Sequence, residues 1–588
     1  MHNSHHHIIS SHVMSFFNSS TFSQQLLSRS LSENGETFYE FKTIDQKIQK
    51  SVAVVSMQLF ENKGLGLRIN DARKKGSSIL HTGALVSICI VSKNRMQADN
   101  SARMCPVCYH ATAKRAFKSS EDNELLCSKE CLQWYSQYYS CCGKMLRLIA
   151  SLQTNCSEQQ RHYVDIHSLL LKYLYITTLL QQQQSLSATN NAMIIQLQNV
   201  FELFQPSEVN TEDLEQATWF HSNVVHLASD LFAMLPARWK TVGDCFYKLV
   251  HVFRYNAQPL PVLGLQHCTE ILCILPPLAR LNHSCAPNCR LVFTLVKRKA
   301  TTSAYEARVR VTLQAMRDIA EGEELTISYL RNDFHKPALR QKLLLESFRF
   351  SCQCERCVAE KERSVRSASP SQGRLEVILH RAALGENVSE EICSSLPQTL
   401  TCCRKVLDEY RNCSSNNPVA AAKPLSNQRS VYAYDAHDTA LLLLSAEGDI
   451  AQKAGMLVGT ALRAACAVIV CDCLHIGGAS CSDGYQRYAL IGAQSMLRLL
   501  LQSGGRAPIA GLCPEGSIDL LVTQVRSHLD RALVELQLLS TACASDLVRG
   551  EEEGETQLGR VDVSSGNYYR KVLQQGTKLC QQFAELLK

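Results

Sequence analysis

Two groups of cysteines in this sequence have spacings that are typical of metal ligands. In the first group, Cys105 and Cys108 are followed by Cys127 and Cys131, which gives the pattern C-x2-C-x18-C-x3-C. Four thiolates at such a spacing suit one tetrahedral structural zinc ion. A redox-active C-x-x-C pair is the alternative interpretation, but the presence of the second pair favours zinc.

The second group is incomplete within its own segment. Cys352, Cys354 and Cys357 form the pattern C-x-C-x2-C in one short loop. Because tetrahedral zinc needs four ligands, the fourth must come from elsewhere in the chain. Cys285 is the natural candidate, and we therefore predict a second zinc site built from Cys285 and these three cysteines.

Cys285 belongs to a segment that carries further groups able to bind a ligand. Residues 280–288 read RLNHSCAPN, in which Asn282 and His283 provide an amide and an imidazole beside a turn fixed by proline. A nonapeptide this specific rarely arises by chance, which favours a functional role over a purely structural one.

Two more segments gain their meaning from their order in the chain. Residues 62–68 read NKGLGLR, and the two glycines let the backbone turn tightly and come close to a ligand. Alone, this segment is more typical of an ordinary β-turn. Residues 321–329 read EGEELTISY, which predicts a polar turn and then a strand that ends in Tyr329. Alone, this second segment could be any surface hairpin.

The composition is that of a globular protein of a reducing compartment. A chain of 588 residues is too long for one hydrophobic core, so two to four domains are expected. We expect no secretory leader and no run of about 18 apolar residues that could span a membrane. The 27 cysteines are then more typical of zinc ligands than of disulfides, and the cytoplasm, the nucleus or both are expected. The formal charge of +7 is too mild to identify a nucleic-acid binder.

The elements that must position these groups follow from the hydrophobic pattern. Residues 51–92 and 246–335 predict short strands and turns, whereas residues 143–235 and the region after about residue 374 predict helices. The first 50 residues predict a polar extension with some helix. The clearest helix starts after Ser517, a suitable N-cap. Its apolar face consists of Ile518, Leu521, Val522, Val525, Leu529, Ala532, Leu533 and Leu536.

Taken in order, these motifs make residues 51–357 resemble the SET-domain family. Within that family they resemble the SMYD group, whose SET domain is split by a MYND-type zinc finger. The resemblance implies an α+β fold with SET-domain β-sheets, an inserted zinc finger and an all-α, TPR-like C-terminal domain. The expected domains are an N-terminal extension (1–50), the first part of the SET domain (51–100), a truncated MYND-like zinc finger (101–142), a helical SET insert (143–245), the catalytic part of the SET domain (246–335), a post-SET zinc loop (336–360), a linker (361–373) and the helical C-terminal domain (374–588).

The resemblance also implies an activity. It is that of a protein-lysine N-methyltransferase that uses S-adenosyl-L-methionine, carries structural zinc and acts on a histone tail or a non-histone protein. Tyr329 would be the catalytic tyrosine between the cofactor, which it also contacts, and a narrow lysine channel. Phe350 would lie near the adenine and Phe348 would line the channel. The other positions implied to bind the cofactor are Lys63, Gly64, Leu65, Gly66, Asn256, Asn282 and His283. A crossing of residues 280–288 with residues 323–330, the family's pseudoknot, would bring these groups together.

This sequence departs from the family pattern at three places. Phe348 stands where many relatives have a tyrosine, and the lost hydroxyl in the lysine channel would favour higher methylation states, which leaves mono-, di- and trimethyl-lysine open as products. Leu65 stands where relatives often have an arginine. The finger lacks the family's middle C-x2-C pair, and Tyr138 and Tyr139 stand where its histidine should be, so one zinc ion is predicted there.

These departures leave a second function open. It is a catalytically weak scaffold that keeps the SET fold and the zinc finger and acts as a protein-interaction module. The truncated finger puts the family's binding of proline-rich partners in doubt, but protein partners can still use the finger and the C-terminal helices. Neither membrane association nor direct nucleic-acid binding is expected. Cofactor binding without methyl transfer would distinguish the scaffold from the enzyme.

Overall fold

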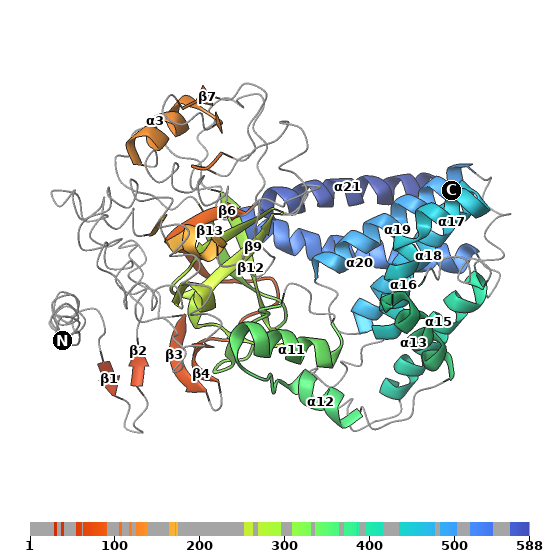
Figure 1. Ribbon diagram of the computed structural model, residues 1–588, viewed down its shortest axis with the longest axis horizontal. Coiled ribbons are helices and arrows are strands. Elements are labelled where there is room, and N and C mark those ends of the chain that lie inside the picture. The colour runs from red at the N-terminus through yellow and green to blue at the C-terminus, as the bar shows by residue number, and fades with distance from the viewer. Residues whose placement is uncertain are drawn as a thin grey trace, which may run out of the picture. The chain divides into compact units, whose positions relative to one another are not determined.

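The chain divides into two compact units in the computed structural model shown in Figure 1. The first unit comprises residues 1–282, 288–327 and 542–568, and the second comprises residues 283–287, 328–541 and 569–588. The structure describes residues 29–31, 37–39, 54–60, 63–90, 105–108, 117–119, 125–138, 164–170, 172–173, 252–262, 269–295, 309–330, 335–363, 370–384, 386, 395–415, 434–476, 482–502, 518–544 and 565–586. The five residues 283–287, which include His283 and Cys285, thus belong to the second unit although both flanking segments belong to the first.

Small β-sheets form the core of the first unit. Their strands are β3 (Val55–Phe60), β4 (Gly64–Ile69), β5 (Ser78–Gly83), β6 (Val86–Ile90), β9 (Ala257–Val262), β10 (Thr269–Ile274), β11 (Asn282–His283), β12 (Cys289–Leu295), β13 (Val309–Ala315) and β14 (Glu324–Ile327). The strand orders are β11-β14-β4-β3, β6-β10-β9 and β12-β13-β5. Each sheet therefore joins strands from residues 51–92 to strands from residues 246–335, the two segments in which the sequence predicts strands.

The alternation of apolar residues explains why these segments pair as sheets. Val309, Val311 and Leu313, at every second position of β13, are completely buried. Strand β13 runs antiparallel to β12 on one side and to β5 on the other. A strand with neighbours on both edges has its backbone hydrogen bonds satisfied, so its apolar side chains can fill the core.

The hairpin of β3 and β4 contains the glycine turn. Gly64 has a φ of 79°, a backbone conformation that favours glycine because it has no Cβ atom. A Cβ atom on Gly66 would lie 2.5 Å from Nδ2 of Asn282 and 2.8 Å from the ring of Phe60. The second glycine is therefore required by the close approach of neighbouring side chains.

The inserted finger also belongs to the first unit. It contains the short hairpin of β7 (Phe117–Lys118) and β8 (Leu125–Leu126), followed by α3 (Lys129–Tyr138). Residues 164–170 and 172–173 are helical, as the pattern of residues 143–235 predicts, and Lys172 Nζ in this helix donates to the carbonyl oxygen of Ser87, 2.7 Å away. The rest of that predicted helical region lies outside the described residues.

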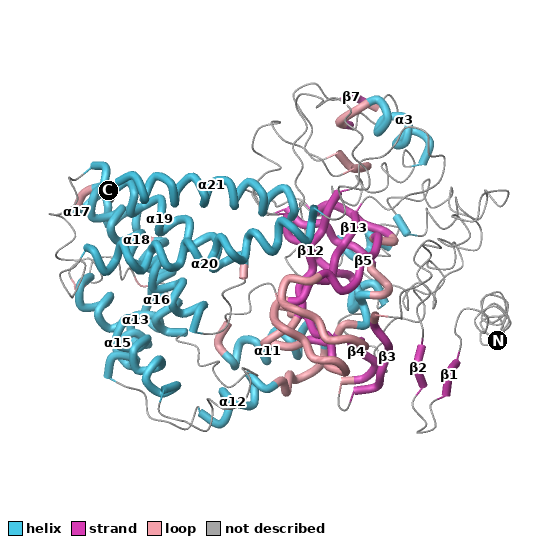
Figure 2. The backbone as a smooth tube through the Cα atoms, turned by 180° about the vertical axis from the view of Figure 1, so that it is seen from behind, coloured by secondary structure: helices cyan, strands magenta, loops and turns pink. Residues whose placement is uncertain are grey.

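Helices make up the described part of the second unit, apart from its loops. They are α11 (Pro337–Phe348), α12 (Glu355–Arg363), α13 (Pro370–Ala383), α15 (Leu396–Ser415), α16 (Tyr434–Ser445), α17 (Glu447–Ala454), α18 (Met456–Ile476), α19 (Asp483–Gln502), α20 (Ile518–Ala544) and α21 (Ser565–Leu586). Helices α18 to α21 lie side by side in both views of the backbone (Figure 2). The all-α C-terminal region that the sequence predicts is confirmed.

The predicted apolar face of α20 is the buried face. Leu521, Val525, Leu529 and Leu536 are all at most 2% exposed, whereas Val534, which is off this face, is 60% exposed. Helix α21 packs against α20, because a Cβ atom on Gly576 would lie 2.5 Å from a methyl group of Leu533. Period-3.6 patterning is thus sufficient to predict this helix and its orientation.

Three expectations differ from the structure. Helix α18 is long and apolar enough to span a membrane by length and composition, so the expectation of no such run is wrong. The most apolar part of Met456–His475 is 78% buried inside the protein, as in a core helix.

The expected linker at residues 361–373 is shorter, because α12 continues to Arg363 and α13 begins at Pro370, where a missing N–H costs nothing. In the N-terminal extension, the described residues form the hairpin of β1 (Arg29–Leu31) and β2 (Thr37–Tyr39) and not a helix.

Replacing Gly66 with alanine should destabilise the first unit. The added methyl group has to displace Asn282 or Phe60, and overpacking of this kind costs about 1–3 kcal/mol. Urea unfolding monitored by intrinsic fluorescence would measure the loss. The control is Gly373→Ala on α13, where nothing lies within 4 Å of the new Cβ atom, so stability should be unchanged or slightly raised. Equal stability of Gly66→Ala and wild type would contradict the close approach.

Candidate active site and metal centres

Four buried cysteines meet in the second unit and form a group able to hold one metal ion, hereafter the Cys285 centre: Cys285, Cys352, Cys354 and Cys357. Their sulfur atoms all lie within 4.8 Å of one another. Cys285 Sγ is 3.9 Å from Cys352 Sγ and 3.5 Å from Cys357 Sγ. Zinc–sulfur bonds of ~2.3 Å in a tetrahedron place the sulfur atoms roughly 3.8 Å apart, so this group fits zinc. The structure thus brings Cys285 together with the three later cysteines, and its role as a zinc ligand stays a prediction.

Helices α11 and α12 hold the three later cysteines in place. After α11 ends at Phe348, Arg349 adopts a left-handed conformation with a φ of 62°, which reverses the chain toward the cysteine loop. The side chain of Gln341 on α11 then binds both backbone groups of Cys352, at 2.8 Å and 2.9 Å. Cys357 lies near the start of α12. The loop is therefore fixed to α11 independently of any metal.

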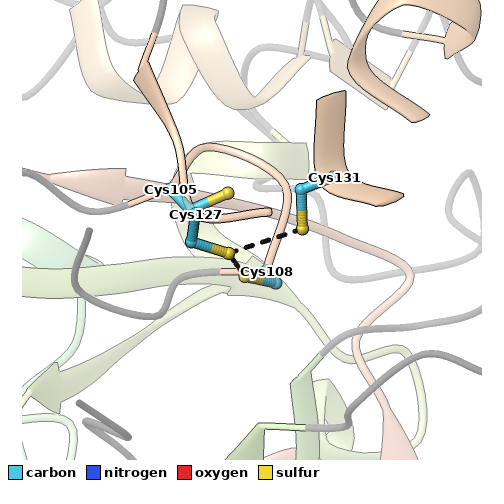
Figure 3. A group of neighbouring side chains, drawn as sticks. All are labelled: Cys105, Cys108, Cys127 and Cys131. Carbon is cyan, nitrogen blue, oxygen red and sulfur yellow. Dashed lines mark hydrogen bonds between the residues drawn. The ribbon is translucent and has the colours of Figure 1, made fainter. Parts of the chain in front are cut away.

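The second group able to hold a metal, hereafter the Cys105 centre, lies in the finger and consists of Cys105, Cys108, Cys127 and Cys131. Figure 3 shows the four sulfur atoms around a common space. Cys127 Sγ lies 3.3 Å from Cys108 Sγ and 3.6 Å from Cys131 Sγ. These distances fit one zinc ion, as the spacing in the sequence predicts. Residues 139–142, where the family's remaining ligands are expected, lie outside the described residues.

The imidazole of His283 connects Tyr329 to the Cys285 centre. The backbone N–H of Tyr329 donates to Nδ1 of His283 at 3.0 Å, so Nδ1 is the acceptor nitrogen. In a neutral imidazole the proton then lies on Nε2, which is 3.3 Å from Cys285 Sγ. The ring is only 5% exposed. One buried side chain thus fixes the backbone of Tyr329 relative to a metal ligand.

Three aromatic rings surround this connection. The ring of Tyr329 lies 4.8 Å from that of Phe348, between ring centroids, and 6.3 Å from that of Phe350. His283 lies 5.9 Å from Phe350. The tyrosine follows two residues after β14 ends at Ile327, so it lies on the loop beyond the strand and not on the strand's last residue. The second unit therefore brings together four residues that the sequence singles out: His283, Tyr329, Phe348 and Phe350.

A polar group in the first unit surrounds the glycine turn. Asn282 Nδ2 donates to Glu324 Oε1 at 2.9 Å, and Lys63 Nζ forms an ion pair with Oε2 of the same carboxylate. The side chain of Glu324 is 13% exposed, so the carboxylate is largely enclosed. It orients the Asn282 amide, whose nitrogen faces Gly66. Sequence reasoning missed Glu324, although it lies in the EGEELTISY segment, because only the tyrosine of that segment was singled out.

Asn288 pins the segment of residues 280–288 to β14. Its Nδ2 donates to Glu323 Oε1 at 2.9 Å and to the carbonyl oxygen of Glu324 at 2.7 Å. Its Oδ1 accepts the backbone N–H of Thr326 at 2.8 Å. Partial burial raises the pKa of Glu323, but hydrogen bonds from Arg317 and Asn288 outweigh it and the net pKa is lowered. The expected pairing of residues 280–288 with residues 323–330 is present in these contacts.

The remaining sequence-predicted residues lie in the first unit. Lys63, Gly64 and Leu65 are exposed on the hairpin of β3 and β4. Asn256 is buried at the end of a helical turn, where its Nδ2 donates to the carbonyl oxygen of Val252 at 2.8 Å. Its contact with a cofactor stays a prediction.

Known proteins are similar to the part of the chain that contains the glycine turn, Asn282, His283 and Tyr329. Residues 64–330 match the family model described as SET domain. These residues resemble a SET domain of the SMYD type. Histone-lysine N-methyltransferase Smyd1 of Mus musculus is 30% identical over 176 residues, which cover 27% of this chain and 34% of the relative. SET domain and MYND-type zinc finger protein 6 of Schizosaccharomyces pombe is 37% identical over 176 residues, covering 29% and 32%.

Other relatives match a longer part of the chain. Histone-lysine N-methyltransferase SMYD3 of Mus musculus is 22% identical over 310 residues, which cover 50% of this chain and 59% of the relative. The chain spans about a third of the length of Smyd1, the first of these relatives. A solved SET domain of LSMT bound to lysine and AdoHcy covers 63% of this chain and 82% of its own, with 14% identity and a TM-score of 0.23.

The chain should carry two zinc ions, one in each centre. Cys285→Ser should lose one, Cys108→Ser the other, and the double variant both, because three thiolates hold tetrahedral zinc poorly. Metal content measured by mass spectrometry after gel filtration tests this. Cys580→Ser, a half-buried thiol outside both groups, is the control and should retain two. Full zinc content in Cys285→Ser would disprove the assignment of that ligand.

Asn288→Ala should destabilise the first unit by about 3 kcal/mol, because it leaves the Thr326 N–H and the Glu324 carbonyl without their partner in a buried site. Thermal unfolding followed by circular dichroism would report the change. The control is Asn70→Ala, whose side chain is half-buried and accepts a hydrogen bond from Ser56; it should cost about 1 kcal/mol. Equal losses in the two variants would argue against a special role for Asn288.

Proposed function

We propose that this chain is an S-adenosyl-L-methionine-dependent protein-lysine N-methyltransferase. The observation that carries the proposal is the connection from Tyr329 through His283 to Cys285, inside a chain segment that matches the SET domain. A tyrosine that served only the core would not need a buried histidine and a cysteine centre to fix its backbone. The names of the relatives, several of which are histone-lysine N-methyltransferases, support the same reaction.

The residues around the glycine turn suit the cofactor. The space beside Gly64 is open, so a ligand can approach the backbone closely there, whereas Gly66 leaves room for the Asn282 amide. That amide is held by Glu324 and offers a fixed hydrogen-bonding group. Cofactor contacts by His283 and Phe350 are proposed from the family resemblance alone. When bound, S-adenosyl-L-methionine supplies a methyl group on a sulfonium.

The aromatic cluster suits the lysine. A free lysine has a pKa near ~10.4, so deprotonating it at pH 7 costs roughly 4–5 kcal/mol. An apolar environment formed by Phe348 and the ring of Tyr329 disfavours the ammonium and so lowers this cost. The hydroxyl group of Tyr329 would orient the neutral amine, and alignment of the two reactants would provide the remaining acceleration.

The protein substrate is proposed at the level of its reactive group. A lysine of a histone tail or of a non-histone protein fits the reaction, and the finger and the C-terminal helices are the surfaces that we propose for protein partners. A location in the cytoplasm, the nucleus or both is proposed with it. The second candidate, a scaffold of weak activity, is supported by the exposed Leu65 in place of an arginine and by Phe348 in place of a tyrosine.

The deciding experiment measures methyl transfer. Labelled S-adenosyl-L-methionine is incubated with core histones and with a protein lysate, and label on lysine is counted. Tyr329→Phe should lower transfer at least about 100-fold, because the hydroxyl that orients the amine is lost. Tyr485→Phe, which removes a buried hydroxyl from the helical region, is the matched control and should keep near-normal activity. Cofactor binding by calorimetry without any transfer by the wild type would instead support the scaffold.

Phe348→Tyr should shift the product toward lower methylation states. The added hydroxyl lies next to Tyr329 and provides a hydrogen-bond partner that restrains the amine or a water molecule after the first transfer. Mass spectrometry of a methylated peptide substrate gives the ratio of mono-, di- and trimethyl-lysine. Phe348→Leu, which adds no hydroxyl, should leave the distribution close to that of the wild type. An identical distribution in wild type and Phe348→Tyr would mean that this position does not restrain the amine.

A further inference from the structure

Two completely buried arginine side chains lie next to the Cys285 centre. Arg340 on α11 and Arg356 on α12 have 0% and 1% of their side chains exposed. A guanidinium is always charged, and a buried charge is costly unless it is paired and hydrogen-bonded. The positions of both helices can be followed in Figure 1.

One carboxylate pairs with both guanidiniums. Glu360 on α12 binds Arg340 through Oε2 and Arg356 through Oε1, the latter at 3.1 Å. The side chain of Glu360 is itself only 8% exposed. The three side chains together therefore carry one net positive charge in a buried place.

The hydroxyl of Tyr434, the first residue of α16, joins all three groups. It accepts hydrogen bonds from Arg340 Nη1 at 2.6 Å and from Arg356 Nη2 at 2.7 Å. It donates its own proton to Glu360 Oε1 at 2.7 Å. A hydroxyl has one donor and two acceptor positions, so Tyr434 is fully used here. This group of four residues is hereafter the arginine network.

The arginine network contacts the metal ligands directly. Arg356 Nη1 donates to the carbonyl oxygen of Cys285 at 2.7 Å, and Arg340 Nη2 lies 3.7 Å from Cys357 Sγ. A divalent ion with four thiolates carries a net charge of −2. The positive arginine network therefore lies next to a negatively charged centre. Each group would lose its neighbouring opposite charge if the other were removed.

We propose that Arg340 and Arg356 are the charge partners of the metal held by the Cys285 centre, and that Tyr434 makes the retention of this metal depend on the seating of helix α16. The proposal requires zinc in the Cys285 centre and does not depend on methyl transfer. Groups that surround metal ligands commonly change metal affinity 10–100-fold when they are removed.

A second contact ties the same two helices together. Lys336, the N-cap of α11, forms an ion pair with Asp435 on α16 at 2.7 Å. The start of α16 is thus held to the start of α11 at two adjacent points. The other end of α11 carries Phe348, which packs against Tyr329. A displacement of α16 would therefore reach both the metal and the aromatic cluster, which makes the helical region a control element for metal loading.

The test is the rate at which the full-length, zinc-loaded protein releases zinc to the chromophoric chelator 4-(2-pyridylazo)resorcinol. The phase from the Cys285 centre is identified in Cys108→Ser, which lacks the other site. Tyr434→Phe removes only the shared hydroxyl, and it should speed release from the Cys285 centre about 10–100-fold while release from the Cys105 centre stays the same. Unchanged release from the Cys285 centre would overturn the proposal, as would absence of zinc from that centre in the wild type.

Tyr485→Phe is the matched control for this test. The hydroxyl of Tyr485 is also buried in the helical region and hydrogen-bonds to His528 at 2.8 Å, but it belongs to α19 and not to the arginine network. It should leave both release rates unchanged. Equal acceleration by Tyr485→Phe and Tyr434→Phe would show a general loosening of the helices and would refute the specific role of Tyr434.

A second measurement needs no change in the arginine network. Hydrogen exchange is recorded on Cys108→Ser with and without its remaining zinc. Removal of that zinc should deprotect the backbone amides of α16 (Tyr434–Ser445), whereas those of α18 (Met456–Ile476) should keep their protection. Full protection of α16 in the metal-free protein would reject the coupling, and this result would stand whether or not the chain transfers methyl groups.

Discussion

The contact of Cys285 with the cysteines that follow α11 is the constraint on which the candidate site depends. Cys285 and Cys352 are separated by 67 positions in the chain, yet their sulfur atoms lie 3.9 Å apart. A metal bond to both would close a long loop, and it would fix the turn that also carries His283. His283 in turn holds the backbone of Tyr329. The backbone position of the proposed catalytic tyrosine therefore depends on contacts with the Cys285 centre.

Buried charge is the second constraint. The arginine network places two buried guanidiniums next to one largely buried carboxylate and one partly buried phenol. Such an arrangement is rarely a net gain in stability over well-packed apolar residues. Its value here is specificity, because the guanidiniums fit only when the thiolate centre, the carboxylate of Glu360 and helix α16 are all in place. The helical region and the metal loop thereby define each other's position within the second unit.

The glycine turn in the first unit is likewise held by contacts between side chains that are distant in the sequence. Gly66 leaves room for the Asn282 amide, and the amide is oriented by Glu324, which also pairs with Lys63. Two of these contacts, Gly66 with Asn282 and Lys63 with Glu324, join β4 or its turn to residues more than two hundred positions later. The sheet β11-β14-β4-β3 supplies the framework for them, since it brings β3 and β4 beside β14 and β11.

The sequence by itself determined which residues have special chemistry. The number and spacing of thiolates predict two zinc sites and the need for Cys285, because the coordination number of zinc is known. The 3.6-residue period predicts the buried face of α20, since amphipathic patterning is a local property. Only the tertiary structure decided which side chains support the cysteine centres and the candidate site residues. Glu324, Gln341 and the arginine network have ordinary local sequences, and Arg340 meets Tyr434 across 94 positions of chain. Charge pairing between distant residues leaves no periodic signal, so folding of the chain is needed to reveal it.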